Sequence, residues 1–471
     1  MQRQRLAFIW IAQVGTSSRM ATPDVLRESW ATRAGFILAA VGSAVGLGNV
    51  WRFPFQVGQE GGAAFLFIYL GFVVLIGFPA MLVEFVIGRH TKRNPVGALR
   101  EFGGRSWQYV GGIFLLVGIV ILSFYSVVAG WVLRYFLASL TGAYVDDPGA
   151  YFAQISIGWD AVLFHAIFIL AVIAIVALGV QRGIELAARL MVPSIVVLLV
   201  GLAIYAFTLE GAADAYAYYL SPDLEEITAN WQGVLPAAAG QALFTLSLGM
   251  GAMITYASYI DEDRNLGEDG GAIIAIDIAI AFVAGLVVFP IIFTAGVDPA
   301  DPGPGAIFVS LADAFAGIGF GWLLGAIFFG AFFLAALTSA ISIIEVIVSY
   351  AIDEHGVDRK VATVAIGVVI FLLGVPTALD AVLFGLYDQL AAEVLLVLGT
   401  LLIMVLVGWI AAPRATAELS KGIDNPGRLV DVWIWLVRVP VVVVLLVSLY
   451  LALLGFADFL QGTFLPWVRE L

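Results

Sequence analysis

The sequence predicts an all-α polytopic membrane protein with about eleven transmembrane helices. The 471-residue chain is 62% hydrophobic and only 12% charged, whereas soluble domains are about half apolar and about a quarter charged. Its mean hydropathy is +1.03. The apolar residues also gather in segments of the length needed to cross about 30 Å of hydrocarbon. Backbone polar groups in lipid must be satisfied within the segment, so these segments are expected to be helices.

Eleven long apolar segments follow one another along the chain. The ninth is marginal in length, whereas the third and eighth exceed about 30 residues and are expected to tilt or to extend past the membrane. The segments span residues 34–56, 63–88, 107–140, 160–179, 185–208, 232–260, 271–296, 318–351, 361–377, 381–411 and 431–456.

The composition excludes several classes of function. There is no cysteine, which rules out disulfides, thiolate zinc sites and cysteine nucleophiles. His90, His165 and His355 are far apart in sequence, and neither an H-E-x-x-H motif nor a phosphate-binding G-x-x-x-x-G-K-S/T motif occurs. The formal charge of −13 argues against a nucleic acid partner. Because no nucleophile–base pair stands out, we do not expect an enzyme, and an integral-membrane hydrolase is a distant alternative.

The basic residues predict the orientation in the membrane. With the N-terminus on the cytoplasmic side, the outer loops at 141–159, 209–231, 297–317 and 378–380 contain no Lys or Arg. Eleven spans then place the C-terminus outside. Eighteen of the 22 Lys and Arg residues fall in the inner segments, namely Arg3, Arg5, Arg19, Arg27, Arg33, Arg89, Lys92, Arg93, Arg100, Arg105, Arg182, Arg189, Arg264, Arg359, Lys360, Arg414, Lys421 and Arg428.

The first and sixth segments are each interrupted by glycines. These are Gly42, Gly46 and Gly48 in the first segment and Gly249 and Gly251 in the sixth. Glycine lowers helix stability by about 1 kcal/mol relative to alanine, and unwound backbone at membrane depth requires protein or a water-filled cavity around it. One such segment alone is better explained by close helix packing. Two of them, five spans apart, favour a transporter built from two inverted five-helix repeats with a site at the midplane.

This architecture predicts the domain organisation. Because Met20 begins a more natural leader, we interpret residues 1–19 as an upstream extension or a disordered stretch. The predicted parts are a cytoplasmic leader at 1–26, a ten-helix transport core at 27–411 with repeats at 34–208 and 232–411, a cytoplasmic loop at 412–430, and an eleventh helix with a short external tail at 431–471.

Further motifs accompany the two interruptions. They are Trp30-Ala31-Thr32-Arg33, Gly42 to Pro54, Gly240-Gln241, Phe244 to Gly251, Thr255-Tyr256-Ala257-Ser258-Tyr259 and Leu337-Thr338-Ser339. In these motifs, and over nearly the whole chain from about Arg27, the sequence resembles the neurotransmitter:sodium symporter family, in particular its bacterial and archaeal amino-acid branch. The resemblance implies unwound helices 1 and 6 within the inverted repeats, plus one extra helix.

The resemblance implies two sodium ions bound by oxygen ligands, as a hard cation requires. Without the resemblance, the hydroxyls of Thr338 and Ser339 are better explained by bonds to their own helix carbonyls. The first site would use the substrate carboxylate together with Ala44, Asn49, Thr245 and Asp277. The second would use Gly42, Val45, Ala335, Thr338 and Ser339.

The resemblance also implies an amino-acid site between the two interruptions. Considered alone, Ile121, Phe244 and Met250 are better explained as core residues, and Tyr125 suits an interfacial position as well. The substrate carboxylate would meet Leu47, Gly48 and Tyr125. The ammonium group would meet Ala44, Phe244, Thr245 and Ser247, and the side chain would lie among Ile121, Phe244, Met250, Ser339 and Ile343.

Charged residues within spans are functional candidates by default. The resemblance assigns Arg52 and Asp388 to an outer gate. It assigns Arg27 and Asp353 to an inner gate, with Trp30 and Tyr259 as neighbours; a snorkelling Arg52 and solvated Arg27 and Asp353 are the alternatives. Glu84 would brace the first and sixth helices, whereas Glu345 and Glu393 have no expected role.

One position bears on chloride. Animal members of the family bind chloride beside the first sodium, and the chain keeps Tyr69, Gln241 and Thr245 of that set. However, Ala281 replaces a serine, and Asp277 stands one helical turn earlier on the same face, where many relatives have asparagine. A carboxylate there would repel chloride and balance the sodium charge itself. We therefore expect transport that does not depend on chloride, with Asp277 as the substituting charge.

The predicted function is sodium-coupled import of hydrophobic amino acids by alternating access. Two alternatives remain open at this point: a non-transporting amino-acid sensor on the same fold, and proton coupling through Asp277. The expected location is the plasma membrane of a prokaryote. The expected partners are the amino-acid substrate, sodium and the lipid bilayer, with no obligatory protein partner.

Overall fold

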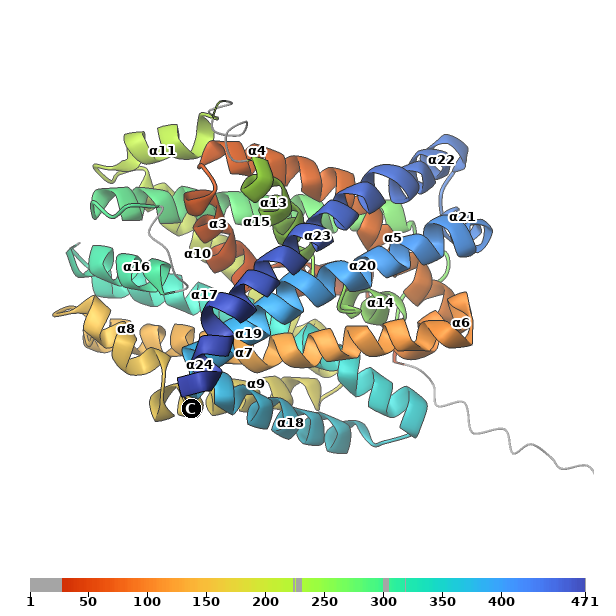
Figure 1. The fold of residues 1–471 in the computed structure, drawn as a ribbon, viewed down its shortest axis with the longest axis horizontal. Helices are drawn as coiled ribbons and strands as arrows, with labels where there is room; N and C mark the ends of the chain where they lie inside the picture. Colours follow the sequence, from red (N-terminus) through yellow and green to blue (C-terminus); the bar gives the residue numbers. More distant parts are fainter. Residues whose placement is uncertain (1–27, 223–224, 226–230, 300–304, 318, 471) are drawn as a thin grey trace, which may run out of the picture.

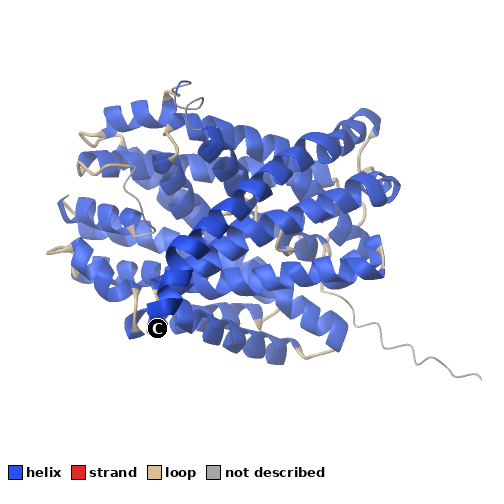
Figure 2. Ribbon diagram, viewed as in Figure 1, coloured by secondary structure: helices blue, strands red, loops and turns tan. Residues whose placement is uncertain are grey.

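The polypeptide is helical throughout the part that the structure describes. The computed structural model describes residues 28–222, 225, 231–299, 305–317 and 319–470. Helices and the loops between them account for all of these residues, with no strand among them (Figure 2). The predicted leader at 1–26 and the gate residue Arg27 lie outside the described residues. The boundaries of the predicted domains and repeats remain predictions.

Nine described helices are long and apolar enough to cross a membrane. They include the marginal ninth segment, which forms a helix of 21 residues. The nine are Ala63–Thr91 (α4, α5), Arg105–Thr141 (α7), Trp159–Val176 (α9), Val180–Ala206 (α10), Leu266–Thr294 (α15), Gly321–His355 (α17), Arg359–Leu379 (α18), Ala381–Ile410 (α19, α20) and Gly427–Glu470 (α22, α23, α24).

The two remaining apolar segments are broken helices. The first consists of α2 (Arg33–Ala44) and a helical piece that runs from Gly48 through α3 (Phe53–Gln59), and the two parts are bent by 48°. The sixth consists of α13 (Trp231–Thr245) and α14 (Ala252–Ala257), with residues 246–251 outside either helix. Together with the nine long helices, they account for the eleven apolar segments of the sequence.

The broken helices are enclosed by longer ones. Helices α7 and α17 pack against each other along much of their length, and α10, α15 and α5 contact the broken segments from other sides. Helix α2 begins where the Thr32 hydroxyl accepts a hydrogen bond from Gly35 N–H, so its first turn has a side-chain cap. The breaks therefore lie in the protein interior, where neighbouring side chains can satisfy their backbone groups.

The short helices gather at two opposite ends of the bundle (Figure 1). Helices α8 (Pro148–Ser156), α11 (Ala212–Leu220) and α16 (Ala306–Gly317) lie at one end, on the left in the view, where the C-terminus is also found. Helices α6 (Pro95–Gly103) and α21 (Ala412–Leu419) lie at the other. The loops that lack Lys and Arg thus share the first end, and the Arg-rich segments share the second.

Candidate functional site

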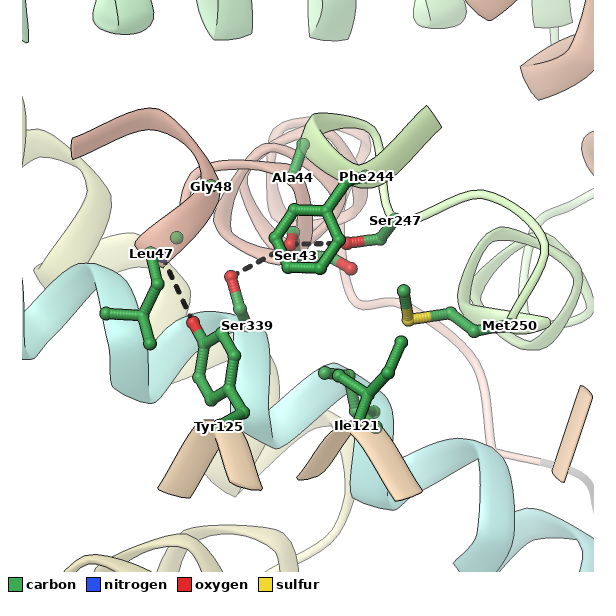
Figure 3. A pocket seen from close by; sticks show the side chains of 12 residues that line it. Ser43, Ala44, Leu47, Gly48, Ile121, Tyr125, Phe244, Ser247, Met250 and Ser339 are labelled. Carbon is green, nitrogen blue, oxygen red and sulfur yellow. Dashed lines mark hydrogen bonds between the residues drawn. The ribbon is translucent and has the colours of Figure 1, made fainter. Parts of the chain in front are cut away.

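A pocket lies between the two broken helices, α7 and α17 (Figure 3). Its empty volume is about 270 Å³. Ten of the eleven predicted substrate residues line it, and the eleventh, Thr245, belongs to the adjoining polar cluster. Ser43 and Gly46 line it as well, although the sequence did not predict them there. The ten are Ala44, Leu47, Gly48, Ile121, Tyr125, Phe244, Ser247, Met250, Ser339 and Ile343.

One end of the pocket is polar. The Tyr125 hydroxyl accepts a hydrogen bond from Leu47 N–H at 3.2 Å, as the dashed line in Figure 3 shows. A Cβ atom on Gly46 would lie 2.2 Å from the Ser339 hydroxyl and 2.8 Å from that of Tyr125. No side chain fits at Gly46 without displacing these groups. The unwound backbone of the first helix therefore faces the pocket directly, with its amides and carbonyls.

The other end of the pocket is apolar. Ile121 approaches from α7 and Met250 extends from the break in the sixth helix (Figure 3). Ile343, on α17, also lines this end. Gly249 and Gly251, on either side of Met250, both have φ of +78°, a conformation that glycine adopts without strain. A Cβ on Gly249 would also lie 2.4 Å from the Leu396 carbonyl. The glycines thus let the backbone turn sharply and present Met250 to the pocket.

A buried polar cluster adjoins the polar end of the pocket and contains three of the four residues predicted for the first sodium. The Asn49 amide donates to Asp277 at 2.8 Å and to Thr245 at 3.0 Å. The Thr245 hydroxyl donates to Asp277 at 3.1 Å. All three side chains are fully buried. Ala44, the fourth predicted ligand, lines the pocket next to this cluster.

The five residues predicted for the second sodium also lie together. The Thr338 hydroxyl is 3.0 Å from the Ala335 carbonyl oxygen and 3.4 Å from that of Val45. The Ser339 hydroxyl is 3.3 Å from the carbonyl oxygens of Gly42 and Val45. The alternative of a bond to a carbonyl of the same helix holds for the shorter contact of Thr338, whereas the hydroxyl contacts of Ser339 all go to the first segment. They link α17 to the end of α2.

Asp277 has no cationic partner among the described side chains. The groups that donate hydrogen bonds to it, on Asn49 and Thr245, are neutral. An unpaired buried carboxylate is costly, by several kcal/mol. The described residues also contain no group of three His, Cys, Asp or Glu that could hold a metal ion. The cluster offers few charges and many neutral oxygens, which suits a monovalent cation better than a divalent one.

Glu84 braces the break of the sixth helix. Its carboxylate accepts hydrogen bonds from Gly249 N–H at 2.8 Å and from Ile254 N–H at 3.2 Å. These peptide groups lie at the break, where helical partners are missing. Glu84 was expected to brace the first helix as well, and among the described residues its hydrogen bonds go to the sixth.

Arg52 was predicted to form an outer gate with Asp388, and that role stays a prediction. Arg52 forms its ion pair with Glu393 at 3.7 Å, rather than with Asp388, among the described residues. Its guanidinium also lies over the Phe244 ring, 4.9 Å from the centroid, so it covers one wall of the pocket. Asp388 remains close enough to interact with the charge of Arg52. Glu393, for which the sequence suggested no role, is thus the direct partner.

Glu345, for which the sequence suggested no role, contacts a residue predicted for the inner gate. Glu345 is fully buried, accepts from the Tyr259 hydroxyl at 2.8 Å and pairs with Arg359 at 2.7 Å. Trp30 lies beside Tyr259, with ring centroids 6.0 Å apart, as expected. Asp353 accepts a hydrogen bond from Asn94 N–H at 2.9 Å, while its predicted partner lies outside the described residues. The intramembrane position of Glu345 was the signal that pointed to it, but its partner could not be read from the sequence.

The residues that bear on chloride lie around Asp277. Tyr69 is buried close to Asp277 and Thr245. The Gln241 amide donates to the Gly48 carbonyl at 2.8 Å. Ala281 is buried one turn after Asp277 on the same helix. The Asp277 carboxylate and the Ala281 methyl group are thus both buried on α15, one turn apart.

Comparisons with known proteins agree with this geometry. A profile of the Sodium:neurotransmitter symporter family matches residues 27–146 and 156–470. The sodium-dependent transporter YhdH of Bacillus subtilis (strain 168) is 34% identical over 448 residues, which cover 91% of this chain and 98% of that protein. A sodium-dependent transporter of Methanocaldococcus jannaschii is 35% identical over 408 residues, 82% of each chain.

A solved structure is similar over almost the whole chain. The crystal structure of MhsT in complex with L-phenylalanine superposes with a TM-score of 0.84 and 40% sequence identity. The match covers 90% of this chain and 100% of that one. The helical arrangement described above is therefore that of a transporter fold.

Proposed function

The chain belongs to the Sodium:neurotransmitter symporter family and is a sodium-dependent transporter rather than an enzyme; from this premise we propose that it imports hydrophobic amino acids with two sodium ions. Transport proceeds by alternating access and does not require chloride. The observation that carries the proposal is the pocket between the broken helices, with a polar end of backbone groups and an apolar end of Ile121, Met250 and Ile343.

The two ends of the pocket match the two parts of an apolar amino acid. Backbone amides of Leu47 and Gly48 with the Tyr125 hydroxyl suit a carboxylate, and nearby carbonyls and Ser247 suit an ammonium group. The apolar end offers no counter-charge to a charged side chain. Methionine is unbranched and adaptable, so Met250 supports acceptance of both aliphatic and aromatic substrates. The bound L-phenylalanine of the MhsT structure is consistent with this class.

Sodium is the second cargo in this proposal. Asn49, Thr245 and Asp277 with the Ala44 carbonyl form the first site, and the five residues around Thr338 form the second. The substrate carboxylate completes the first site, so substrate and sodium each raise the affinity of the other by the same factor. For Asn49 to serve as a ligand, its amide must turn so that its oxygen faces the ion. The inward sodium gradient then drives uphill transport.

Chloride independence rests on Asp277 and Ala281. A buried carboxylate beside the first sodium site supplies the negative charge that a chloride ion would otherwise provide, and a methyl group replaces a hydroxyl donor. We expect uptake to be unaffected when gluconate replaces chloride. The double variant Asp277→Asn with Ala281→Ser should make uptake depend on chloride. Collapse of wild-type uptake without chloride would contradict this part of the proposal.

The two gates close the pocket from either side. Arg52, paired with Glu393, covers the pocket wall at Phe244, and Glu345 pairs with Arg359 at the start of α18. Because the Arg-rich segments share the α6 end, we place that end and the N-terminus in the cytoplasm and the C-terminus outside. The family and the bacterial relatives support a prokaryotic plasma membrane.

The decisive test is accumulation in proteoliposomes. Purified protein should accumulate labelled hydrophobic amino acids against a gradient with external sodium but not with potassium. Thermal stabilisation by each of the twenty amino acids, in sodium and in potassium, then ranks the substrates. Binding without accumulation would indicate a sensor, and uptake driven by a proton gradient alone would indicate proton coupling.

A matched pair of ligands tests the need for a substrate carboxylate. Gly46 lines the pocket and has no side chain, so the protein supplies no carboxylate there and the ligand must bring its own. Tryptophan and leucine should therefore bind, whereas the corresponding amines, tryptamine and isoamylamine, should not. Comparable sodium-dependent binding of an amino acid and its amine would exclude this binding mode.

A further inference from the structure

Arg438 is an exposed arginine on the membrane-facing surface of the eleventh span. It belongs to the helix Gly427–Glu470, whose most apolar stretch is only 17% buried. Exposed apolar side chains precede and follow it along the same helix. These neighbours include Leu429, Val432, Val439, Val443 and Leu446. A permanent positive charge thus stands within a face that is otherwise suited to lipid chains.

The guanidinium of Arg438 is held by one backbone carbonyl. Its Nε donates to the Gly408 carbonyl at 2.5 Å. Gly408 lies in the last turn of the tenth span, where carbonyls lack helical partners. A Cβ on Gly408 would lie 3.3 Å from Arg438 Cγ, so glycine lets the arginine approach closely. The bond fixes the side chain beside the end of Ala381–Ile410 that leads into α21.

The remaining donors of Arg438 have no protein partner among the described residues. A guanidinium has five N–H donors, and only the Nε bond is made within that part of the chain. Asp431, the nearest acidic residue before it on the same helix, is exposed and forms no ion pair with it there. An arginine on a lipid-facing surface requires a partner at the level of the headgroups. The planar fork of its two terminal nitrogens fits phosphate oxygens in a bidentate manner.

Two tryptophans flank the arginine. Trp435 lies three residues before Arg438, on the same helix face, and is 57% exposed. Trp409 follows Gly408 directly and is 51% exposed. The short segments Leu406–Ile410 and Val437–Val441, which hold Trp409 and Arg438, contact each other, as do the adjoining helices α20 and α23. Exposed tryptophan is typical of the membrane–water interface, so these side chains place Arg438 near the headgroups of the leaflet on the α6 and α21 side.

We propose that Arg438, oriented by Gly408 and flanked by Trp409 and Trp435, binds the phosphate of a glycerophospholipid in that leaflet, which is the cytoplasmic one in the orientation proposed above. The phosphate accepts from the terminal nitrogens of Arg438, and the indole rings pack on the upper part of the lipid. The site lies on the outer surface of the tenth and eleventh spans, separate from the central pocket.

The first test uses the wild-type protein and compares headgroups. Delipidated protein in detergent is titrated with phosphatidylglycerol or with a diglucosyl diacylglycerol of the same acyl chains, and bound lipid is counted by native mass spectrometry. We expect about fivefold tighter retention of the phospholipid, the contribution of one arginine near a phosphate. Equal retention of the two lipids would overturn the proposal. Displacement of the phospholipid by millimolar inorganic phosphate would overturn it too, because the occupant would then be a free ion.

The second test compares two arginines. Arg438→Gln should abolish the preference for phosphatidylglycerol, whereas Arg438→Lys should keep part of it. Arg428→Gln is the matched control, since Arg428 is also exposed on this helix but lies near its α21 end; it should keep the full preference. An unchanged preference in Arg438→Gln overturns the proposal. A change of oligomeric state without a change of lipid retention also does so, since the surface would then join two copies of the chain.

Discussion

Buried carboxylates have neutral partners at the centre of the protein and arginine partners at its α6 and α21 end. At the centre, Asp277 is surrounded by the neutral donors of Asn49 and Thr245. At the α6 and α21 end, several buried acids have arginine partners at 2.7–2.9 Å. These acids are Asp269 with Arg33 and Arg264, Glu345 with Arg359, and Glu418 with Arg89.

The difference indicates which charges are permanent and which are transported. A carboxylate paired with an arginine is neutralised in every state in which the two remain together. Asp277 lacks such a partner among the described residues, so its charge is left for a cation that arrives and departs. Glu84, the other acid near the centre, is satisfied by peptide N–H groups at the break of the sixth helix. Asp277 is therefore the central charge best suited to couple sodium to transport.

Replacement of the central carboxylate should have the largest effect. In Asp277→Asn, sodium-induced thermal stabilisation and sodium-driven uptake should be abolished in chloride-free buffer, because the first site loses its only protein charge. Stability without sodium should be kept or increased, since an unpaired buried charge is removed. Asp269→Asn is the control: it should lower stability equally in sodium and potassium. If Asp277→Asn still responds to sodium, the central carboxylate is not the charge that binds sodium.

Removal of a paired carboxylate should instead affect stability. Glu418 and Arg89 are both buried and pair at 2.7 Å, so Glu418→Ala leaves an uncompensated charge. We expect a loss of about 3 kcal/mol, measured by denaturation in detergent, with little change in sodium affinity for the protein that remains folded. Glu101→Ala breaks the exposed pair with Arg93 and should change stability by less than about 1 kcal/mol. Equal losses of stability in the two variants would show that burial does not determine the contribution of these ion pairs.

The apolar half of the pocket should respond more weakly. Met250→Phe places a rigid ring between Gly249 and Gly251, where an unbranched side chain now lies. The ratio of tryptophan to leucine affinity should fall by about tenfold, a typical effect of side-chain volume in a pocket. Sodium affinity measured with leucine should change little. If the ratio stays at its wild-type value, Met250 does not set the size of the pocket.

Acid should weaken the peripheral network by the smallest amount. Burial acts to raise the pKa of Glu418, but hydrogen bonds from Lys421, His90 and Arg89 outweigh it and hold the pKa below its usual value of 4.5. A carboxyl group with a lowered pKa in the folded state adds stability above its usual pKa, and this contribution is lost as pH falls through the lowered value. The melting temperature of the wild type should therefore decline more steeply below about pH 4.5 than that of Glu418→Gln. Parallel declines would exclude Glu418 as the titrating group.

The sequence was most informative where backbone chemistry decides the structure. Apolar length predicted the spans. Paired glycines predicted both breaks, because each glycine weakens the helix in the middle of a span and leaves room for a neighbouring group to approach the backbone. The pocket followed from the breaks together with the family resemblance. The peptide groups at its polar end leave no signal of their own in a sequence, because every residue has them. The glycines were the signal that these peptide groups would be exposed to the pocket.

Side-chain partners across the bundle were harder to predict. Asp388 was expected to pair with Arg52, yet the partner is Glu393. The segment Gln389–Leu395 is a π-helix, in which residues five apart lie nearly one above the other. Asp388 and Glu393 therefore share a face, although ordinary α-helical spacing would separate them. No residue in the sequence indicates this change of helical period.

The contact between Glu84 and the sixth segment also bears on how the chain is made. The sixth segment consists of helices of 15 and 6 residues with a break between them, where the Gly249 N–H finds its acceptor on Glu84 and not within the segment; alone in lipid, that N–H would lack a partner. Glu84 belongs to a span synthesised 165 residues before Gly249. When the sixth segment leaves the ribosome, the acceptor for its exposed N–H groups is already in the membrane. Because the second span is synthesised first, its Glu84 is available to accept hydrogen bonds from the break of the sixth span while that span is being inserted.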